Sequence, residues 1–403
     1  MSRYLFVVPP LTGHTNPAVG VASELIGRGH EVAWVAHEAV VGHLLPAGAV
    51  VFDPGDRFLH RAAELVGERE KLRGASALKF LWQEFLCPLA LDMGPAVTDG
   101  LRSFAPDVVV ADQQALAGGI LAERFGVPWA TSATTTSELV DPLAGAPKVA
   151  DWIIAAWSAV ELELGVPIDL IGRHDPRFSR HLILAYTTEA FTGPIPNERQ
   201  VSFVGPVLNG RPDDRPLPSD FLDRHDANIL ISLGTVSEGT GDRFLRVAVE
   251  AVANQPYGAI VVGRREIFPK EIPDNVIVRE SVPQLALLDR LDGVVSHGGH
   301  NTVCETLSHG LPLVVAPIRD DQPIIAAQVV TAGAGVRVSF PRVSAADLRD
   351  AIHDILATPA YRLAAGRIAE SFIAAGGEVA AAKRLEALAT GAPVPSPAEL
   401  ASR

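Results

Sequence analysis

The residues best suited to chemistry lie in a glycine-containing segment, residues 297–302, which reads His-Gly-Gly-His-Asn-Thr. The segment follows an apolar run at residues 293–296 and precedes residues with helical spacing. Two glycines between a strand and a helix let the backbone approach a ligand closely, and the first free amides of the helix form an anion site. A diphosphate would fit there, with His297 donating a hydrogen bond to it. Alternatively, Asn301 or Thr302 caps the helix and His297 is a turn histidine bonded to backbone.

A second polar segment, residues 319–322, follows a predicted strand and reads Arg-Asp-Asp-Gln. A carboxylate beside an amide can accept from and donate to neighbouring hydroxyls, as the binding of a sugar ring requires. Acidic residues that complement the dipole at a helix N-terminus are the structural alternative. A metal site at Asp320 and Asp321 is disfavoured, because nothing nearby supplies the remaining ligands.

One histidine near the start of the chain is placed where a general base could act. It is His14, in the loop Gly-His-Thr-Asn-Pro that follows the first predicted strand. Histidine is suited to removing a proton near neutral pH, although a histidine in such a loop can also brace the following helix. Several other histidines are expected to be surface or structural residues: His37, His43, His174 and His225.

Repeated strand and helix patterns must position these segments in the first half. The apolar run at residues 4–8 is stopped by two prolines, as expected of a buried strand in a parallel sheet. Residues 17–29 then show helical spacing and end on a glycine. The pattern recurs at residues 107–130. The first half is therefore predicted to be a doubly wound α/β domain.

The second half repeats this organisation. It follows a proline-rich and charged stretch between residues 203 and 221, which is predicted to be a linker. Residues 228–235 are predicted to be a strand followed by a glycine-containing turn, and further strands are predicted at residues 257–262, 276–279, 293–296 and 312–316. The sequence thus predicts an N-terminal domain, a linker, a C-terminal domain and a tail, at residues 1–205, 206–221, 222–385 and 386–403. Ligands gather at the carboxyl ends of parallel strands, so we expect the active site in a cleft between the two domains.

Bulk properties agree with two soluble domains. The chain has 403 residues, of which 48% are hydrophobic, enough for two separate cores. A net charge of -13 argues against binding to nucleic acid or anionic membrane. Cys87 and Cys304 cannot form a disulfide framework or a four-ligand zinc site. The first apolar run is too short for a signal-peptide core or a membrane span. We expect a cytoplasmic monomer or homodimer.

The string HGGHNTVCETLSHGLPLVVAPIRDDQPIIAAQVVTAGAGVRV strongly resembles the donor-binding signature of family 1 glycosyltransferases. This UDP-glycosyltransferase-like group includes bacterial natural-product enzymes. Glycines, histidine, asparagine, glutamate, proline and the Asp-Gln pair are all in step with that signature. The resemblance implies the α/β GT-B fold, in which two Rossmann-like, doubly wound parallel-sheet domains face each other across a cleft.

The resemblance also implies roles for single residues in binding a nucleotide-sugar donor. Those assigned to the diphosphate are His297, Gly299, Asn301 and Thr302, and Thr235 resembles a further phosphate-contacting hydroxyl. Glu305 would hold the ribose hydroxyls. Asp321 and Gln322 would bind the hydroxyls of the sugar.

One departure from the family concerns the nucleobase. Residues 281–284 read Ser-Val-Pro-Gln and resemble a Trp-x-Pro-Gln box, in which the tryptophan ring carries the base. Ser281 stands in place of that tryptophan, so stacking is weaker or comes from elsewhere. Val282 and Gln284 can still offer backbone contacts. The sequence therefore leaves uridine and thymidine diphosphates open.

The family motif Gly-His-x-x-Pro matches residues 13–17 and implies that His14 is the general base. In the family a carboxylate orients this histidine and stabilises its imidazolium, as in a triad without the serine. Asp112, which ends the strand at residues 108–111, matches that carboxylate in place. A strand-end aspartate in a turn is the structural alternative.

The implied activity is one-step inverting transfer of a sugar from a UDP- or dTDP-sugar to a hydroxyl of a lipophilic acceptor. The nucleotide sugar would be a co-substrate, and no metal or other cofactor is expected. Residues 58–97 and the strand end at residues 132–134 would line the acceptor pocket, although aromatic residues at helical spacing are usually core. The alternatives are a catalytically silent GT-B auxiliary protein and a nucleotide-sugar epimerase or hydrolase.

Overall fold

The computed structural model describes residues 1–69, 72, 74–140, 145–195, 201–209, 213, 215–234 and 241–392. The chain forms two compact units. The first comprises Met1–Tyr186, Ile195–Arg211 and Ala374–Arg403, and the second comprises Thr187–Pro194 and Pro212–Ile373. Each unit is built on one parallel sheet, which confirms the predicted pair of doubly wound α/β domains.

The first unit has a seven-stranded sheet in the order β3-β2-β1-β4-β5-β6-β7, with every neighbouring pair parallel. Its strands are β1 (Arg3–Val7), β2 (Glu31–Val35), β3 (Val50–Phe52), β4 (Val108–Asp112), β5 (Trp129–Ala133), β6 (Leu182–Ala185) and β7 (Val201–Phe203). The strand order reverses between β1 and β4, which pair with Val7 opposite Ala111. The residues that follow these two strands therefore meet at the carboxyl edge of the sheet, where ligands bind in such folds.

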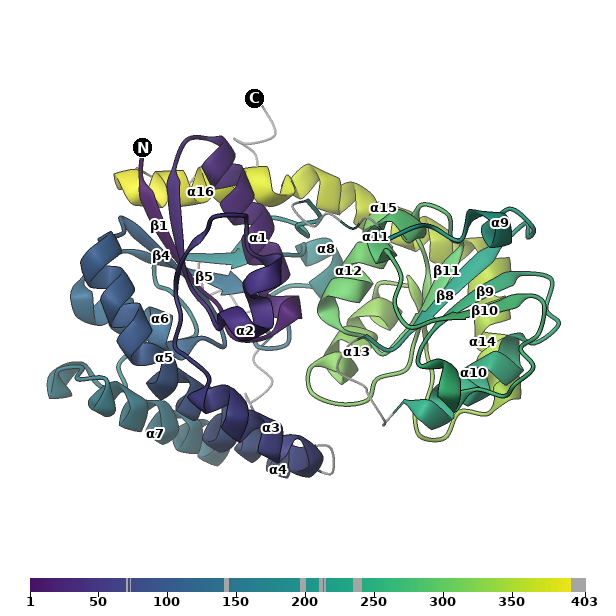
Figure 1. Ribbon diagram of the computed structural model, residues 1–403, viewed down its shortest axis with the longest axis horizontal. Helices are drawn as coiled ribbons and strands as arrows, with labels where there is room; N and C mark the ends of the chain where they lie inside the picture. The colour runs from purple at the N-terminus through teal and green to yellow at the C-terminus, as the bar shows by residue number, and fades with distance from the viewer. Residues whose placement is uncertain are drawn as a thin grey trace. The chain divides into compact units, whose positions relative to one another are not determined.

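Helices cover both faces of this sheet, because successive residues of each strand point to opposite faces. Tyr4 and Phe6 pack against α1 (Thr12–Gly27) and α16 (Gly377–Thr390), whereas Leu5 and Val7 share a core with α5 (Cys87–Asp99) and α6 (Leu116–Phe125). Helices α1 and α16 lie side by side, as Figure 1 shows. The other helical segments are α2 (Glu38–Val41), η1 (Gly42–Leu44), α3 (Arg57–Arg69), α4 (Ala75–Phe80), η2 (Leu81–Leu86), η3 (Gly100–Phe104), α7 (Pro147–Glu163) and η4 (Ile168–Leu170).

The second unit has a six-stranded parallel sheet in the order β10-β9-β8-β11-β12-β13. Its strands are β8 (Asn228–Ser232), β9 (Gly258–Val262), β10 (Val276–Arg279), β11 (Gly293–Ser296), β12 (Leu313–Val315) and β13 (Gly335–Arg337). Here the order reverses between β8 and β11, so the segment that follows β11 lies at the switch point of the sheet. This is the predicted diphosphate segment.

Eight α-helices and one short 3₁₀ turn surround this second sheet in the described part of the chain. They are α8 (Glu189–Thr192), α9 (Ser219–Leu222), α10 (Asp242–Val252), η5 (Arg265–Ile267), α11 (Gln284–Leu288), α12 (His300–Ser308), α13 (Gln322–Thr331), α14 (Ala345–Ala357) and α15 (Pro359–Ala375). Across the described residues of both units, no helix is both long and apolar enough to cross a membrane.

The two units differ from the predicted domain boundaries in two places. Helix α16, predicted to close the C-terminal domain at residue 385, belongs to the first unit, because Leu385 is buried with Phe6 and Leu25 in one core. Helix α8, predicted in the N-terminal domain, belongs to the second unit, because Phe191 packs with Val303. Among the described residues, the long second-unit segment begins after residue 209, inside the predicted linker.

Candidate active site

His14 lies in the first turn of α1, directly after the loop that ends β1. The sequence predicts a loop at this point, but the helix begins at Thr12, and the amide of His14 donates to the carbonyl of Leu11 at 3.0 Å. The His14 side chain is 17% exposed, so the imidazole is held by the protein and still reaches the surface. This is the position that a general base requires.

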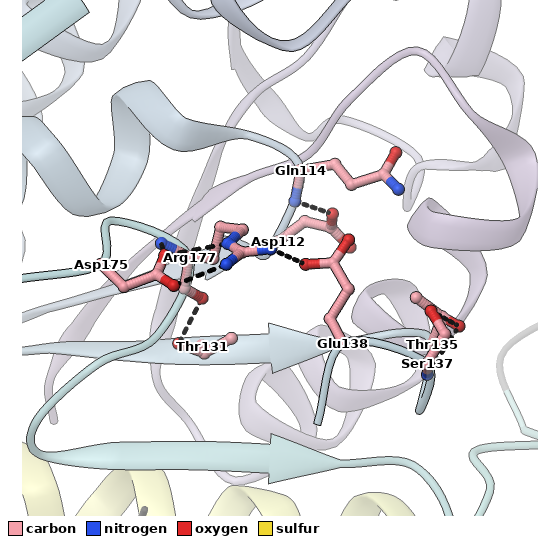
Figure 2. Close-up of polar contacts among 8 residues, drawn as sticks. All are labelled: Asp112, Gln114, Thr131, Thr135, Ser137, Glu138, Asp175 and Arg177. Atoms are coloured by element: carbon pink, nitrogen blue, oxygen red, sulfur yellow. Dashed lines mark hydrogen bonds and ion pairs between the residues drawn. The ribbon is translucent and has the colours of Figure 1, made fainter. Parts of the chain in front are cut away.

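Asp112 is the last residue of β4 and faces His14. His14 Nδ1 lies 3.0 Å from both carboxylate oxygens of Asp112, whose side chain is fully buried. Asp112 Oδ1 also accepts a hydrogen bond from the backbone amide of Gln114 at 2.8 Å (Figure 2). The structure thus brings together the predicted base and its predicted carboxylate, which are 98 residues apart in the sequence.

A third side chain, Thr134, joins this pair. Its hydroxyl donates to Asp112 Oδ2 at 2.9 Å and lies 2.6 Å from His14 Nδ1. Sequence reasoning assigned the strand end at residues 132–134 to the acceptor region and did not connect it with the histidine. No sequence motif marks Thr134; it reaches the pair because it directly follows β5, which neighbours β4 in the sheet.

The hydrogen bonds determine which imidazole nitrogen of His14 is free to accept a proton. An ionised carboxylate only accepts hydrogen bonds, so His14 Nδ1 must carry a proton to bond to Asp112. The lone pair of the neutral ring is then on Nε2. A histidine in this arrangement can take a proton on Nε2 while the carboxylate stabilises the imidazolium that forms.

A partly buried ion-pair cluster lies beside the loop that follows β5. Arg177 donates to Glu138 at 3.0 Å and makes two hydrogen bonds to Asp175, at 2.7 and 2.9 Å (Figure 2). The guanidinium also lies 5.3 Å from the ring centre of Trp82 and 5.3 Å from that of Phe178. Burial raises the pKa of Glu138 above its ordinary value, although the positive charge of Arg177 opposes this shift. Because its guanidinium lies over two aromatic rings and makes paired hydrogen bonds to Asp175, Arg177 is held rigidly and anchors this loop.

In the second unit, His297 directly follows β11 and its ring is packed between two glycines. A Cβ atom at Gly234 would lie 2.7 Å from the ring, and one at Gly299 would lie 2.6 Å from Nε2. Burial, together with the positive charge of Arg319, lowers the pKa of His297 to about 4. His297 is therefore neutral at neutral pH and offers an N–H donor without a charge. Its Nδ1 is buried and has no hydrogen-bond partner among the residues that the structure describes.

Helix α12 begins immediately after this histidine. Gly299 occupies the N-cap position and has no side chain, while Asn301 and Thr302 lie within the first turn. Neither of those residues is therefore the N-cap, which was the structural alternative. Gly298 has a φ of +88°, and a Cβ there would lie 2.9 Å from the side chain of Val315. The amides of this first turn can receive an anion, as expected at a helix N-terminus.

The predicted sugar-binding pair lies at the start of α13. Gln322 Oε1 accepts hydrogen bonds from the amides of Ile318 at 2.8 Å and Arg319 at 3.1 Å. The amide oxygen is thus used to shape the loop, and only the NH₂ group remains for a ligand. Asp321 is the residue before the helix, and Asp320 has a φ of +55°, so this loop is held in a conformation that costs free energy.

The residues assigned to ribose and base also lie together. Gln284 donates to Glu305 Oε2 at 2.6 Å, which connects the start of α11 to the middle of α12. Val282 is buried, whereas Ser281 is exposed. Thr235, the further phosphate contact expected from the sequence, lies outside the described residues.

The chain is similar to known proteins over most of its length. Residues 258–388 match the family described as Erythromycin biosynthesis protein CIII-like, C-terminal domain. The chain is 29% identical to 4'-demethylrebeccamycin synthase of Lentzea aerocolonigenes, over 96% of this chain and 99% of that protein. It is 28% identical to demethyllactenocin mycarosyltransferase of Streptomyces fradiae, over 96% of this chain and 87% of that protein.

A solved structure shows the same fold over the whole length. The calicheamicin glycosyltransferase CalG4 superposes with a TM-score of 0.78 at 23% identity, covering 98% of this chain and 100% of that one. The comparisons confirm the predicted GT-B fold and the predicted resemblance to glycosyltransferases of natural-product biosynthesis.

Proposed function

We propose that this chain, which is a glycosyltransferase of the GT-B fold, moves a sugar from a UDP- or dTDP-sugar to a hydroxyl of a lipophilic natural-product acceptor, with inversion at the sugar carbon. The observation that carries the proposal is the hydrogen-bonded pair of His14 and Asp112 at the carboxyl edge of the first sheet. A related mycarosyltransferase, named above, supports a small natural-product acceptor.

The proposed reaction has one step. The acceptor hydroxyl gives its proton to His14 Nε2 as its oxygen attacks the anomeric carbon, and the bond from that carbon to the diphosphate breaks. Asp112 stabilises the imidazolium that results. Because attack and departure occur on opposite faces of the carbon, the product has the inverted configuration.

The second unit supplies the groups for the leaving diphosphate. The first-turn amides of α12 and an N–H of the neutral His297 would share its negative charge. Asp321 and the NH₂ group of Gln322 would hold the sugar hydroxyls, while Glu305 would hold the ribose. We propose that the reaction uses no metal and no bound cofactor.

An apolar pocket in the first unit supports a lipophilic acceptor. Its lining begins with two residues of the loop that leads into α1, one turn before His14, and continues along α3, α4 and η2. The lining residues are Pro10, Leu11, Phe58, Leu59, Ala62, Ala63, Leu65, Phe80, Glu84 and Phe85. A mostly apolar lining with one carboxylate suits a planar or lipophilic molecule better than a second sugar.

A panel of UDP- and dTDP-sugars, each incubated with and without lipophilic alcohols, tests the activity. Release of nucleotide that depends on the acceptor is the expected result, with a product whose anomeric configuration is opposite to that of the donor. Release without an acceptor would instead indicate a hydrolase, and interconversion of the donor an epimerase. No turnover with any pair would favour an auxiliary protein.

The variant His14→Gln tests the assigned base. We expect kcat to fall roughly 10²- to 10⁴-fold, as for loss of a general base, while the nucleotide still binds. His174→Gln, which changes an exposed histidine, is the matched control and should keep the wild-type kcat. A folded His14→Gln variant with full turnover would remove His14 from the mechanism.

A further inference from the structure

Thr134 is bonded to both members of the catalytic pair and has no role in the mechanism described so far. Its side chain is buried, with 4% of the residue exposed. The hydroxyl donates to Asp112 Oδ2 at 2.9 Å, and the same oxygen lies 2.6 Å from His14 Nδ1. A single hydroxyl thus closes a ring of three hydrogen-bonding groups.

The protons shared among His14, Asp112 and Thr134 can be assigned by counting donors. The Thr134 hydroxyl has one proton, which it donates to Asp112, so its oxygen faces His14 as an acceptor. The proton on His14 Nδ1 therefore has two acceptors, the Asp112 carboxylate and the Thr134 oxygen. Both favour the imidazole tautomer with its lone pair on Nε2, and two acceptors restrict rotation of the imidazole more than one does.

The fold holds Thr134 in place from both sides. On one side, β5 pairs with β4 in a register that puts Ser132 opposite Asp112, so Thr134 follows two residues later. On the other side, the loop after Thr134 contains Glu138, which pairs with Arg177 at 3.0 Å.

Arg177 is itself tied to β5. Its carbonyl accepts a hydrogen bond from the Thr131 hydroxyl at 3.1 Å, and its guanidinium is fixed by Asp175. Figure 2 shows Arg177 between Asp175 and Glu138, with Asp112 in the same view. The segment that carries Thr134 is thus held by contacts on both sides of it, at Thr131 and at Glu138.

From this geometry we propose that Thr134 is a positioning residue for the reaction: its hydroxyl fixes the orientation of His14 and completes the hydrogen bonds of Asp112. The inference rests on the proposed function, in which His14 is the base. The imidazole is bonded to Asp112 from β4 and to Thr134 from the end of β5.

The first test needs neither donor nor acceptor. In protein labelled with ¹⁵N-histidine, the Nδ1–H proton of His14 should give a downfield NMR signal, which His14→Gln identifies by its loss. Thr134→Val removes the hydroxyl at nearly constant shape and should shift or broaden this signal. Thr98→Val is the matched control, because the Thr98 hydroxyl donates to the Gly94 carbonyl within α5, and it should leave the signal unchanged.

The second test separates orientation from binding. We expect Thr134→Val to lower kcat roughly 10- to 100-fold, the effect of one hydrogen bond to a charged group, with little change in the KM of the donor. Thr134→Ser restores the hydroxyl and should recover most of kcat. Thr134→Ala replaces the valine variant if valine disturbs folding.

The outcomes distinguish failure of this proposal from failure of the proposed function. A Thr134→Val protein with an unchanged His14 signal and unchanged kcat overturns the proposal, and so does a serine variant as slow as the valine variant. If the wild type shows no turnover at all, the proposed function fails, but the NMR comparison still decides whether Thr134 orients His14.

Discussion

At the scale of the residue, His297 shows how a buried imidazole can serve a site for an anion without carrying charge. The ring is enclosed by Gly234 and Gly299 and lies near the guanidinium of Arg319, so protonation is disfavoured. In the proposed reaction its contribution to the diphosphate is therefore a hydrogen bond. The positive potential at that point comes from the guanidinium of Arg319 and the amides of α12.

The depressed pKa of His297 has a consequence for stability. In the unfolded chain an ordinary histidine takes up a proton near pH 6.5, whereas in the folded protein His297 does so only near pH 4. Between these values the unfolded state binds more protons, so stability falls as the pH falls. A shift of this size corresponds to a loss of about 3 kcal/mol across that window.

The comparison of wild type with His297→Gln measures this effect. We expect the free energy of unfolding of the second unit to decline less between pH 7 and pH 4.5 in the variant, because glutamine does not titrate. Urea unfolding at several pH values, followed by the methyl NMR signal of the buried Ile231, gives the slopes. His174→Gln should keep the wild-type slope, and equal slopes in all three proteins would mean that His297 is not buried as neutral imidazole.

At the scale of the element, the turn between β11 and α12 depends on glycine for two separate reasons. Gly298 has a left-handed φ of +88° and also lies against Val315, where a Cβ would be only 2.9 Å away. Gly29, at the end of α1, has nearly the same φ of +86°, but a Cβ there would have no neighbour within 4 Å among the described residues. A comparison of substitutions at these two glycines therefore separates the cost of backbone strain from the cost of steric conflict.

The variants Gly298→Ala and Gly29→Ala exploit this difference. We expect Gly29→Ala to cost about 1 kcal/mol of unfolding free energy in its unit, from the φ value alone. Gly298→Ala should cost roughly 1–3 kcal/mol more in its own unit, and it should weaken binding of UDP or dTDP because the α12 amides shift. Urea unfolding and calorimetric titration with nucleotide give both quantities. Equal costs for the two variants would show that Val315 simply moves aside.

The buried strands and the turn after β11 were largely predictable from the sequence. Continuous apolar runs such as those of β1, β4 and β11 read as buried parallel strands, and the glycines after β11 marked the turn. The start of α1 was less predictable. Pro17 suggested a helix that begins there, yet α1 begins at Thr12 and tolerates the proline in its second turn, giving up one backbone hydrogen bond.

At the scale of the whole molecule, the limits of prediction come from contacts between distant segments. His14, Asp112 and Thr134 lie at the carboxyl ends of three different strands, and the strand order that brings them together is a property of the sheet. The family motif indicated the first two. Thr134 has no motif of its own, so its role became visible only once β5 was placed beside β4.

Helix α16 illustrates the same limit. Its apolar spacing predicts a helix that covers a core but not which core, because alanine and leucine pack equally well on either sheet. In the structure Leu385 is fully buried on the first sheet, and the amide of Gly377 donates to the Val204 carbonyl at 2.6 Å. The first unit is thus completed by residues from the far end of the chain.

The variant Leu385→Ala tests this assignment. We expect the first unit to lose about 2–5 kcal/mol of unfolding free energy, the usual cost of such a cavity in a core. Tryptophan fluorescence reports on that unit, since all five tryptophans lie in it, at residues 34, 82, 129, 152 and 157. Hydrogen exchange of β8 and β11 reports on the second unit and should not change.

Leu363→Ala is the control, because Leu363 lies on α15 in the second unit and is 64% exposed. It should alter the stability of either unit by no more than about 0.5 kcal/mol. If residues up to 385 instead completed the C-terminal domain, Leu385→Ala would accelerate exchange in β8 and β11 and leave the fluorescence transition in place. Because the two readouts report on different sheets, one substitution decides which core the last helix completes.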